Sequence, residues 1–115
     1  MPAEVKGIVF RSKDKSVTAQ FYADLGLGMQ DHEHGGPRHF GVLPISPTFV
    51  LEIYQASEAY DVDAILLNVD SISEALLVAK KYGIEPITEL RVVGNLQSVY
   101  IKDPDGRAVM LLGGR

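Results

Sequence analysis

The sequence lacks cysteine and tryptophan, and it contains neither a long hydrophobic run nor a cluster of basic residues. Without cysteine there are no disulfides, thiolate metal ligands or thiol nucleophiles. No apolar stretch reaches the length that spans a membrane, and the N-terminal residues have no apolar core typical of a signal peptide. The net charge of −4 argues against nucleic acid as a partner. We therefore expect a cytoplasmic protein that binds neither nucleic acid nor membrane.

What the sequence does contain is an internal repeat. A shift of 57 positions places residues 7–27 on 64–84, and residues 50–53 fall on 108–111 after a one-residue adjustment. Identities are few, but the order agrees: an apolar run, a capping cluster, an amphipathic segment and a glycine. A period this long fits two duplicated supersecondary modules rather than a solenoid.

The first module is predicted to be βαβββ. Asp14 can cap a helix in which Val17, Phe21 and Leu25 share one face, and Gly26 can end that helix. The strands expected around it are 5–11, 28–32, 38–43 and 48–54. The Gly-Gly-Pro segment at 35–37 and the Pro-Ile-Ser-Pro segment at 44–47 separate the last three strands.

The second module repeats this plan. Ser71 and Glu74 form a capping box that predicts a helix from there to about residue 82, ended by Gly83. The expected strands are 64–69, 85–93, 97–102 and 107–112, and Gly113-Gly114 is interpreted as a frayed tail. Asp103-Pro104-Asp105-Gly106 is the strongest turn signal.

Together these elements predict one α+β domain over residues 1–115. It consists of two βαβββ modules, about 4–56 and 62–115, related by an internal pseudo-two-fold axis. Their mixed sheets are expected to form a cup.

Three motifs connect the chain to a known family: Phe-Tyr-Ala-Asp-Leu-Gly-Leu at 21–27, Val-Leu-Glu-Ile at 50–53, and Asp-Pro-Asp-Gly at 103–106. In this order and spacing they resemble the vicinal oxygen chelate superfamily, which includes glyoxalase I, extradiol dioxygenases, fosfomycin-resistance enzymes and bleomycin-resistance proteins. The resemblance covers nearly the whole chain and is closest in character to the metal-free bleomycin-resistance-like members.

The resemblance implies four metal-ligand positions, which fall here on Gly7, Glu52, Ala64 and Met110. Only Glu52 has a suitable donor, because glycine and alanine have none and a thioether is a poor ligand for the metals concerned. We therefore expect no metal and no other cofactor. Gly7 and Ala64 are expected to leave room where other members carry histidines.

A second possible metal site is the histidine cluster. On a strand His32 and His34 share a face, and His39 could return to them across the Gly-Gly-Pro turn. The alternative is a solvated hairpin tip in which these histidines are simply polar.

Strand alternation, with the resemblance, also predicts the residues that line the cup. The candidate ligand-binding residues are Arg11, Glu52, Tyr54, Asn68, Ser98, Tyr100 and Met110. Cavity-facing and core-facing residues are expected to share one side of each sheet. Glu52 could be a binding group, a general base or a partner that neutralises Arg11, and without Arg11 it would favour a cationic or hydrogen-bond-donating ligand.

Two functions follow. The first is a metal-free binding protein that sequesters a largely apolar small molecule in the cup. The second is an enzyme, of lyase, isomerase or dioxygenase type, with Glu52 as catalytic base or with a non-standard metal site. A cup filled by its own side chains, in a protein that acts only through partners, is a third possibility. In each case we expect a homodimer, because small sheet domains leave long edges to cover.

Overall fold

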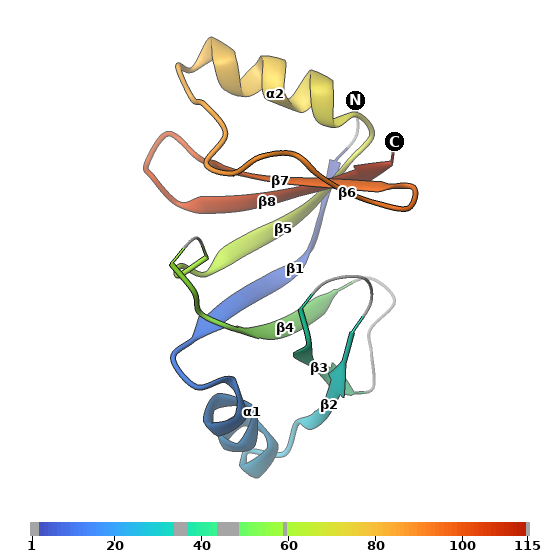
Figure 1. Cartoon of the computed structure of the whole chain (residues 1–115), viewed down its shortest axis with the longest axis vertical. Coiled ribbons are helices and arrows are strands. Elements are labelled where there is room, and N and C mark those ends of the chain that lie inside the picture. The colour runs from blue at the N-terminus through green and yellow to red at the C-terminus, as the bar shows by residue number, and fades with distance from the viewer. Residues whose placement is uncertain (1–2, 34–36, 44–48, 59, 115) are drawn as a thin grey trace. The chain divides into compact units, whose positions relative to one another are not determined.

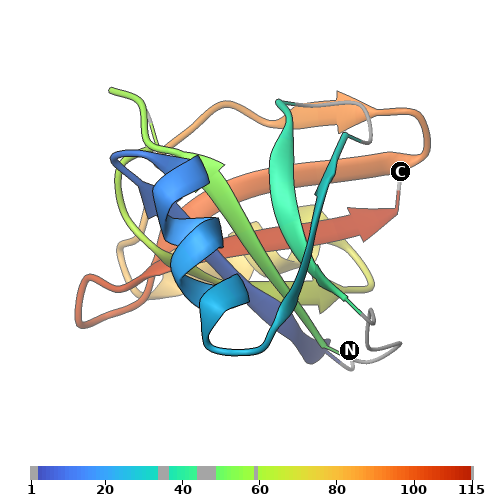
Figure 2. The ribbon, with the colours of Figure 1, turned by 90° about the horizontal axis from the view of Figure 1, so that it is seen from below.

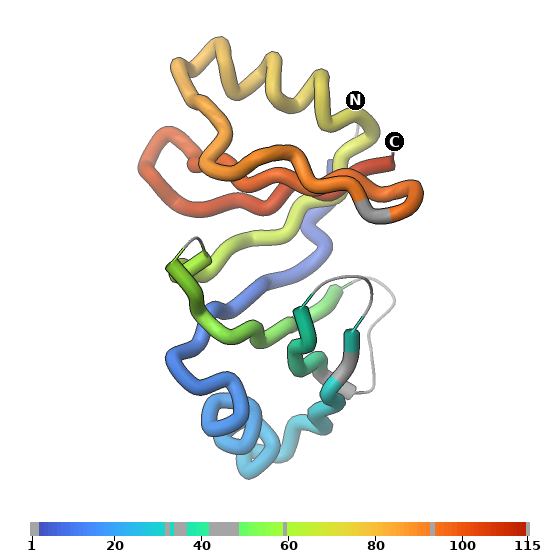
Figure 3. The backbone as a smooth tube through the Cα atoms, viewed as in Figure 1, coloured from blue at the N-terminus to red at the C-terminus, as the bar shows by residue number. Residues whose placement is uncertain are grey.

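The computed structural model describes residues 3–33, 37–43, 49–58 and 60–114 (Figure 1). Figure 3 traces the path of the chain. Within them the chain forms an α+β fold in which each half has the order βαβββ, as the repeat predicts (Figure 1). The elements are β1 (Ala3–Ser12), α1 (Lys15–Asp24), β2 (Gly28–His32), β3 (His39–Leu43), β4 (Val50–Gln55), β5 (Ala64–Val69), α2 (Ile72–Lys81), β6 (Arg91–Val93), β7 (Leu96–Lys102) and β8 (Ala108–Gly114).

The chain divides into two compact units, and the division runs through β1. One unit is Gly7–Asp63, and the other is Ala64–Arg115 together with Met1–Lys6. In each unit the first strand of the repeat pairs in parallel with the last, β1 with β4 and β5 with β8. The pairs β2–β3, β3–β4, β6–β7 and β7–β8 are antiparallel. Each unit thus contains mixed strand pairing, as predicted.

Both helices begin and end as the sequence predicts. The Asp14 carboxylate accepts hydrogen bonds from the backbone N–H groups of Ser16 and Val17, at 3.1 and 3.3 Å. Ser71 Oγ accepts one from Glu74 N at 3.2 Å. After the helices, Gly26 and Gly83 have φ values of 112° and 73°, a region that glycine enters without the steric cost of a Cβ.

The core of the unit that contains α2 lies between this helix and the sheet. It is formed by Val69, Ile72, Ala75, Val99, Val109 and Leu111. The four core residues on strands, Val69, Val99, Val109 and Leu111, lie on one face of β5, β7 and β8. This face packs against α2.

In the other unit α1 packs against β2, β3 and β4 (Figure 2). Ala19 is buried, and the ring of Tyr22 stacks on that of Phe10 in β1 with centroids 6.2 Å apart. The face that carries Val17, Phe21 and Leu25 is exposed to solvent and is not packed against the strands.

The strand expected at 85–93 is wrong in its first part, because only Arg91–Val93 forms a strand. Pro86 has no N–H to give to a ladder. Beyond it, Ile87 N donates to Tyr100 O at 2.8 Å, while Tyr100 N donates to the hydroxyl of Thr88 at 3.2 Å. A side chain therefore takes the backbone donor that a longer β6 would have used.

The interpretation of Gly113-Gly114 as a frayed tail is also wrong. Both residues belong to β8, where Gly113 pairs with Gln97 and Gly114 with Leu96. The ladder to β7 holds this segment although glycine has a low strand propensity.

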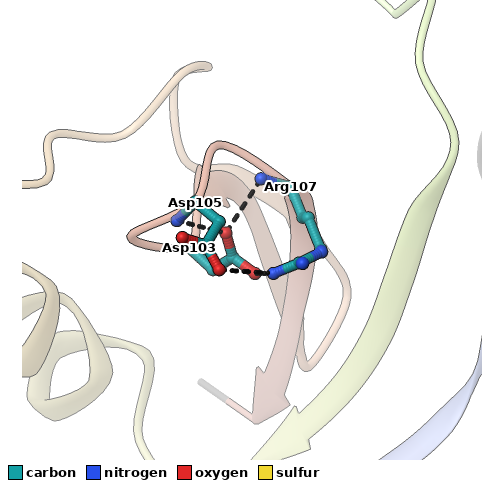
Figure 4. A network of polar contacts seen from close by, with 3 residues as sticks. All are labelled: Asp103, Asp105 and Arg107. Atoms are coloured by element: carbon teal, nitrogen blue, oxygen red, sulfur yellow. Dashed lines mark hydrogen bonds and ion pairs between the residues drawn. The ribbon is translucent and has the colours of Figure 1, made fainter.

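The Asp-Pro-Asp-Gly turn between β7 and β8 is closed by its own side chains (Figure 4). Asp103 Oδ1 accepts from the backbone N–H groups of Asp105 and Arg107, both at 2.9 Å. The Arg107 guanidinium donates to both carboxylates, at 3.3 Å for Asp103 and 2.9 Å for Asp105. The backbone hydrogen bond from Arg107 is the main reason that the pKa of Asp103 is lowered. These contacts explain the motif as a turn that is stabilised by its own side chains.

Candidate functional site

Three of the predicted ligand-binding residues lie on one face of the unit Gly7–Asp63. In the parallel pair of β1 and β4, Arg11 lies opposite Tyr54 and Val9 lies opposite Glu52. Phe10, between Val9 and Arg11, contacts Tyr22 of α1. Since neighbouring side chains on a strand alternate, Arg11, Glu52 and Tyr54 lie on the sheet face turned away from α1.

Strand β3 adds a residue to this face that sequence reasoning did not connect to Glu52. His39 Nε2 lies 2.9 Å from Glu52 Oε2, and its ring stacks on that of Tyr54 with centroids 4.2 Å apart. The His39 side chain is 1% exposed and that of Glu52 is 13% exposed. The pair is therefore a nearly dehydrated acid–base element. In the sequence, this contact is indicated only by the alternation of side chains along β3 and β4. The alternation identifies the pair only when the β3–β4 register is known.

The hydrogen bonds of His39 determine how many protons the pair holds. His39 Nδ1 lies 3.1 Å from the carbonyl oxygen of Pro37, which can only accept. With a carboxylate at Nε2, both ring nitrogens need a proton unless Glu52 itself is protonated. His39 and Glu52 together thus hold one proton more than a neutral imidazole and a carboxylate would.

The electrostatics favour the imidazole as the site of that proton. Burial by itself lowers the pKa of His39, and the charge of Lys15 acts in the same direction. The hydrogen bonds to Glu52 and Pro37 and the negative charge of Glu52 outweigh both, so the pKa is raised above 6.5. An imidazolium facing a carboxylate is the form that these contacts favour.

Arg11 lies beside this pair in an aromatic setting. Its guanidinium carbon is 4.5 Å from the ring centroid of Tyr54 and 4.9 Å from that of Tyr60, within the range of cation–π contacts. Its backbone N–H donates to Asp63 Oδ1 at 2.9 Å. The pairing of Arg11 with Glu52 stays a prediction. The premise that Glu52 would otherwise lack a buried partner is wrong, because His39 supplies one.

The solvated hairpin tip proposed for the histidines is wrong for His39, which is buried. The β2–β3 register does bring His39 opposite His32, as a return across the turn requires. His34 lies outside the described residues, and so does the side chain of His32. Within the part of the chain that the structure describes, no three His, Asp or Glu side chains converge as a metal site would need.

The four family metal-ligand positions do not fit a metal here. The expectation of room at Gly7 is wrong, because a Cβ there would overlap the carbonyl oxygen of Val50 and lie 2.8 Å from its Cγ2. Ala64 is 4% exposed and has no donor. The registers match the repeat, with Glu52 opposite Val9 and Met110 opposite Leu66. Only Glu52 offers a hard ligand, and His39 engages it.

The other predicted residues gather on a single face of the second unit. Met110 lies opposite both Leu66 and Tyr100, and Leu112 lies opposite both Asn68 and Ser98. Registered residues share a face.

This face is turned away from α2, since the alternate positions Val99 and Leu111 form the core with that helix. This face is also core-facing, because Leu66 and Tyr100 on it are buried, so the expectation that cavity-facing and core-facing residues share one side stays a prediction. Tyr100 is buried, at 7% exposed, whereas Asn68, Ser98 and Met110 are half-buried.

Asn68 also lines a surface pocket of about 500 Å³ within this unit. Val69, Leu96 and Leu112 contribute apolar surface to the pocket, and Glu4 and Asp70 contribute carboxylates. Its volume lies within the range of roughly 300–1,000 Å³ typical of small-molecule sites.

Comparison with known proteins agrees with this architecture. The family model described as Glyoxalase/Bleomycin resistance protein/Dioxygenase superfamily matches residues 5–111. No curated protein sequence matches the chain significantly.

Solved structures with the same fold are distant in sequence. Methylmalonyl-CoA epimerase from Mycobacterium tuberculosis is 14% identical with a TM-score of 0.62, over 98% of this chain and 87% of that one. A superfamily member from Vibrio splendidus 12B01 is 12% identical with a TM-score of 0.67, over 99% and 100% of the two chains. A V278E glyoxalase I mutant from Zea mays is 12% identical with a TM-score of 0.72, over 96% of this chain and 42% of that one. At these identities the likeness is one of fold.

Proposed function

Since the chain belongs to the glyoxalase/bleomycin resistance protein/dioxygenase superfamily, we propose that it is a metal-free protein that binds a small, largely apolar molecule. The observation that carries the proposal is the 2.9 Å contact between His39 and Glu52. It engages the one donor among the four family metal positions, so Glu52 acts within a hydrogen-bonded pair rather than as a metal ligand.

The character of the two sheet faces supports a small organic ligand. On the face turned away from α1, Arg11, Glu52 and Tyr54 stand beside buried Val9. On the face turned away from α2, Asn68 and Ser98 stand beside Leu66 and Leu112. A few polar groups on an apolar surface can orient a ligand while apolar burial supplies the affinity. Each face by itself offers a surface of this kind.

Native mass spectrometry of the freshly purified full chain tests this proposal. We expect a retained organic molecule and no divalent ion near one equivalent. Near-equimolar zinc, iron, nickel or manganese that disappears in Glu52→Gln would overturn the metal-free proposal. A metal lost from a His32→Ala/His34→Ala variant instead would place an ion at the histidine cluster, which also contradicts it.

An enzyme that abstracts a proton from a C–H bond is the second candidate. Two observations favour it: the His39–Glu52 pair is an acid–base element, and methylmalonyl-CoA epimerase is among the proteins that share the fold. A base of this kind would take a proton next to a carbonyl group while His39 holds the carboxylate in place.

Isotope exchange separates the two candidates. The retained molecule is incubated with the protein in D₂O, released, and weighed by mass spectrometry. A binding protein leaves its mass unchanged, apart from exchange seen without protein. Uptake of deuterium at carbon, lost in Glu52→Gln, would establish the enzyme and overturn binding as the sole function.

A further inference from the structure

The pocket of about 500 Å³ in the unit that contains α2 combines an apolar side with negative charge. It lies at the edge where the start of β1, the start of β7 and the ends of β5 and β8 meet, beside the beginning of α2 (Figure 1). Asn68 and Leu112 belong both to this pocket and to the sheet face turned away from α2. A ligand held on that face would therefore contact the pocket.

The apolar side of the pocket has room for a hydrocarbon group. Val69, Leu96 and Leu112 line it, and Leu96 is 50% exposed. Leu96 lies opposite Gly114, which has no side chain to cover it. A Cβ at Gly114 would have one described neighbour within 4 Å, the carbonyl oxygen of Asn95 at 3.9 Å. An apolar group of a ligand can therefore be buried beside these residues.

The charged groups of the pocket are negative. Glu4 and Asp70 contribute carboxylates, whereas none of the described lining residues is cationic. Within the part of the chain that the structure describes, neither carboxylate is engaged in a hydrogen bond or ion pair. The N-terminus of α2, which begins at Ile72, adds a partial positive charge of about half an elementary charge, too little to balance two carboxylates. The pocket therefore favours a cation.

The lining suits an organic cation better than a metal ion. Among the described residues no three His, Asp or Glu side chains converge, whereas Ca²⁺ takes roughly six to eight oxygen ligands. An ammonium group can donate hydrogen bonds to carboxylates and to the amide oxygen of Asn68, while a hydrocarbon body covers the apolar side. On the basis of the proposed binding function, we propose that this pocket takes a small molecule with an ammonium group and an apolar body.

Amide NMR titration of the full chain tests the charge preference with probes that share one alkyl chain: hexylammonium, 1-hexanol and hexanoate. Hexylammonium should shift the amide signals of Leu112, Gly113 and Gly114 saturably. It should bind about 5- to 10-fold more tightly than 1-hexanol, as two exposed ion pairs allow. Hexanoate should bind more weakly than 1-hexanol. Equal affinities for hexylammonium and hexanoate would overturn the proposal, and so would the absence of saturable shifts at these amides.

Removal of either carboxylate should weaken the binding of hexylammonium. Glu4→Gln and Asp70→Asn should each raise its dissociation constant about two- to fivefold and leave that of 1-hexanol unchanged. The matched control is Glu85→Gln, which removes the same charge beyond the other end of α2, a helix about 15 Å long. It should change neither constant. If Glu85→Gln acts as strongly as Asp70→Asn, net charge rather than this pocket attracts the cation, and the proposal is refuted.

Filling the pocket tests its apolar side. Gly114 does not have a positive φ, so its backbone accepts a side chain without strain. Gly114→Leu should abolish the binding of both hexylammonium and 1-hexanol and leave the thermal midpoint nearly unchanged. Undiminished binding to the folded variant would place the probes elsewhere and contradict the proposal.

Native mass spectrometry distinguishes failure of the ammonium pocket from failure of the proposed function. A retained molecule without a basic nitrogen would refute the ammonium pocket and leave the metal-free binding function standing. A near-equimolar metal ion lost in Glu52→Gln would refute that function instead, and the probe titrations would still decide the charge preference of the pocket.

Discussion

Replacing His39 by alanine is expected to lower the free energy of unfolding by about 3 kcal/mol, the lower end of the range for removing one partner of a buried ion pair. Glu52 loses a donor at 2.9 Å, the carbonyl of Pro37 loses another at 3.1 Å, and the ring leaves a cavity against Tyr54. Urea denaturation at pH 6 measures the loss. His39→Gln is the matched control, because its amide can still donate to Glu52, and it should recover part of the stability.

The same variant should reveal the proton held by the pair. A pKa raised in the folded state adds stability that is fully present below the unfolded value of about 6.5 and is lost as pH rises through the folded pKa. The gap in unfolding free energy between wild type and His39→Ala should therefore be larger at pH 6 than at pH 9. An equal gap at both pH values would show that His39 acts by packing alone.

Replacing Gly7 by alanine should destabilise the protein by about 3 kcal/mol, at the upper end of the usual cost of overpacking. The new Cβ would overlap the carbonyl oxygen of Val50, and a backbone atom cannot rotate away. Strand β4 would have to shift, although its register with β1 also positions Glu52 and Tyr54. Thermal unfolding should show a midpoint lower by roughly 10 °C or more.

Gly114→Ala is the control for this substitution, because Gly114 is also a strand glycine but the nearest atom to its added Cβ is Asn95 O at 3.9 Å. Its midpoint should change little. Gly7→His should be at least as unstable as Gly7→Ala and should bind no zinc, although it restores a family-type ligand. A folded, zinc-binding Gly7→His variant would contradict the steric argument.

The elements that sequence reasoning placed correctly are those with local causes. Asp14 and Ser71 cap their helices through hydrogen bonds to residues two or three positions away. Gly26 and Gly83 end the helices through their own φ angles. The repeat then supplied the order of the strands, because a duplicated sequence folds into duplicated modules.

Errors arose where a distant segment competes for a backbone group. The strand predicted at 85–93 is shorter in the structure, because Pro86 lacks a backbone N–H and the Thr88 hydroxyl accepts a hydrogen bond from Tyr100 N. The glycines at 113 and 114 became part of β8 because β7 offered them a ladder. Neither contact can be read from the residues next to it in the chain.

The sequence by itself determined the βαβββ order of both halves, the helix ends and the absence of a family-type set of metal donors, since all of these depend on residue type and local spacing. Only the tertiary structure decided which partner Glu52 has, why Gly7 must be glycine, and which face of α1 remains exposed. These three depend on strand register and on the side from which a helix packs. A shift of one residue would change each of them without altering the sequence pattern that predicts the strands and helices.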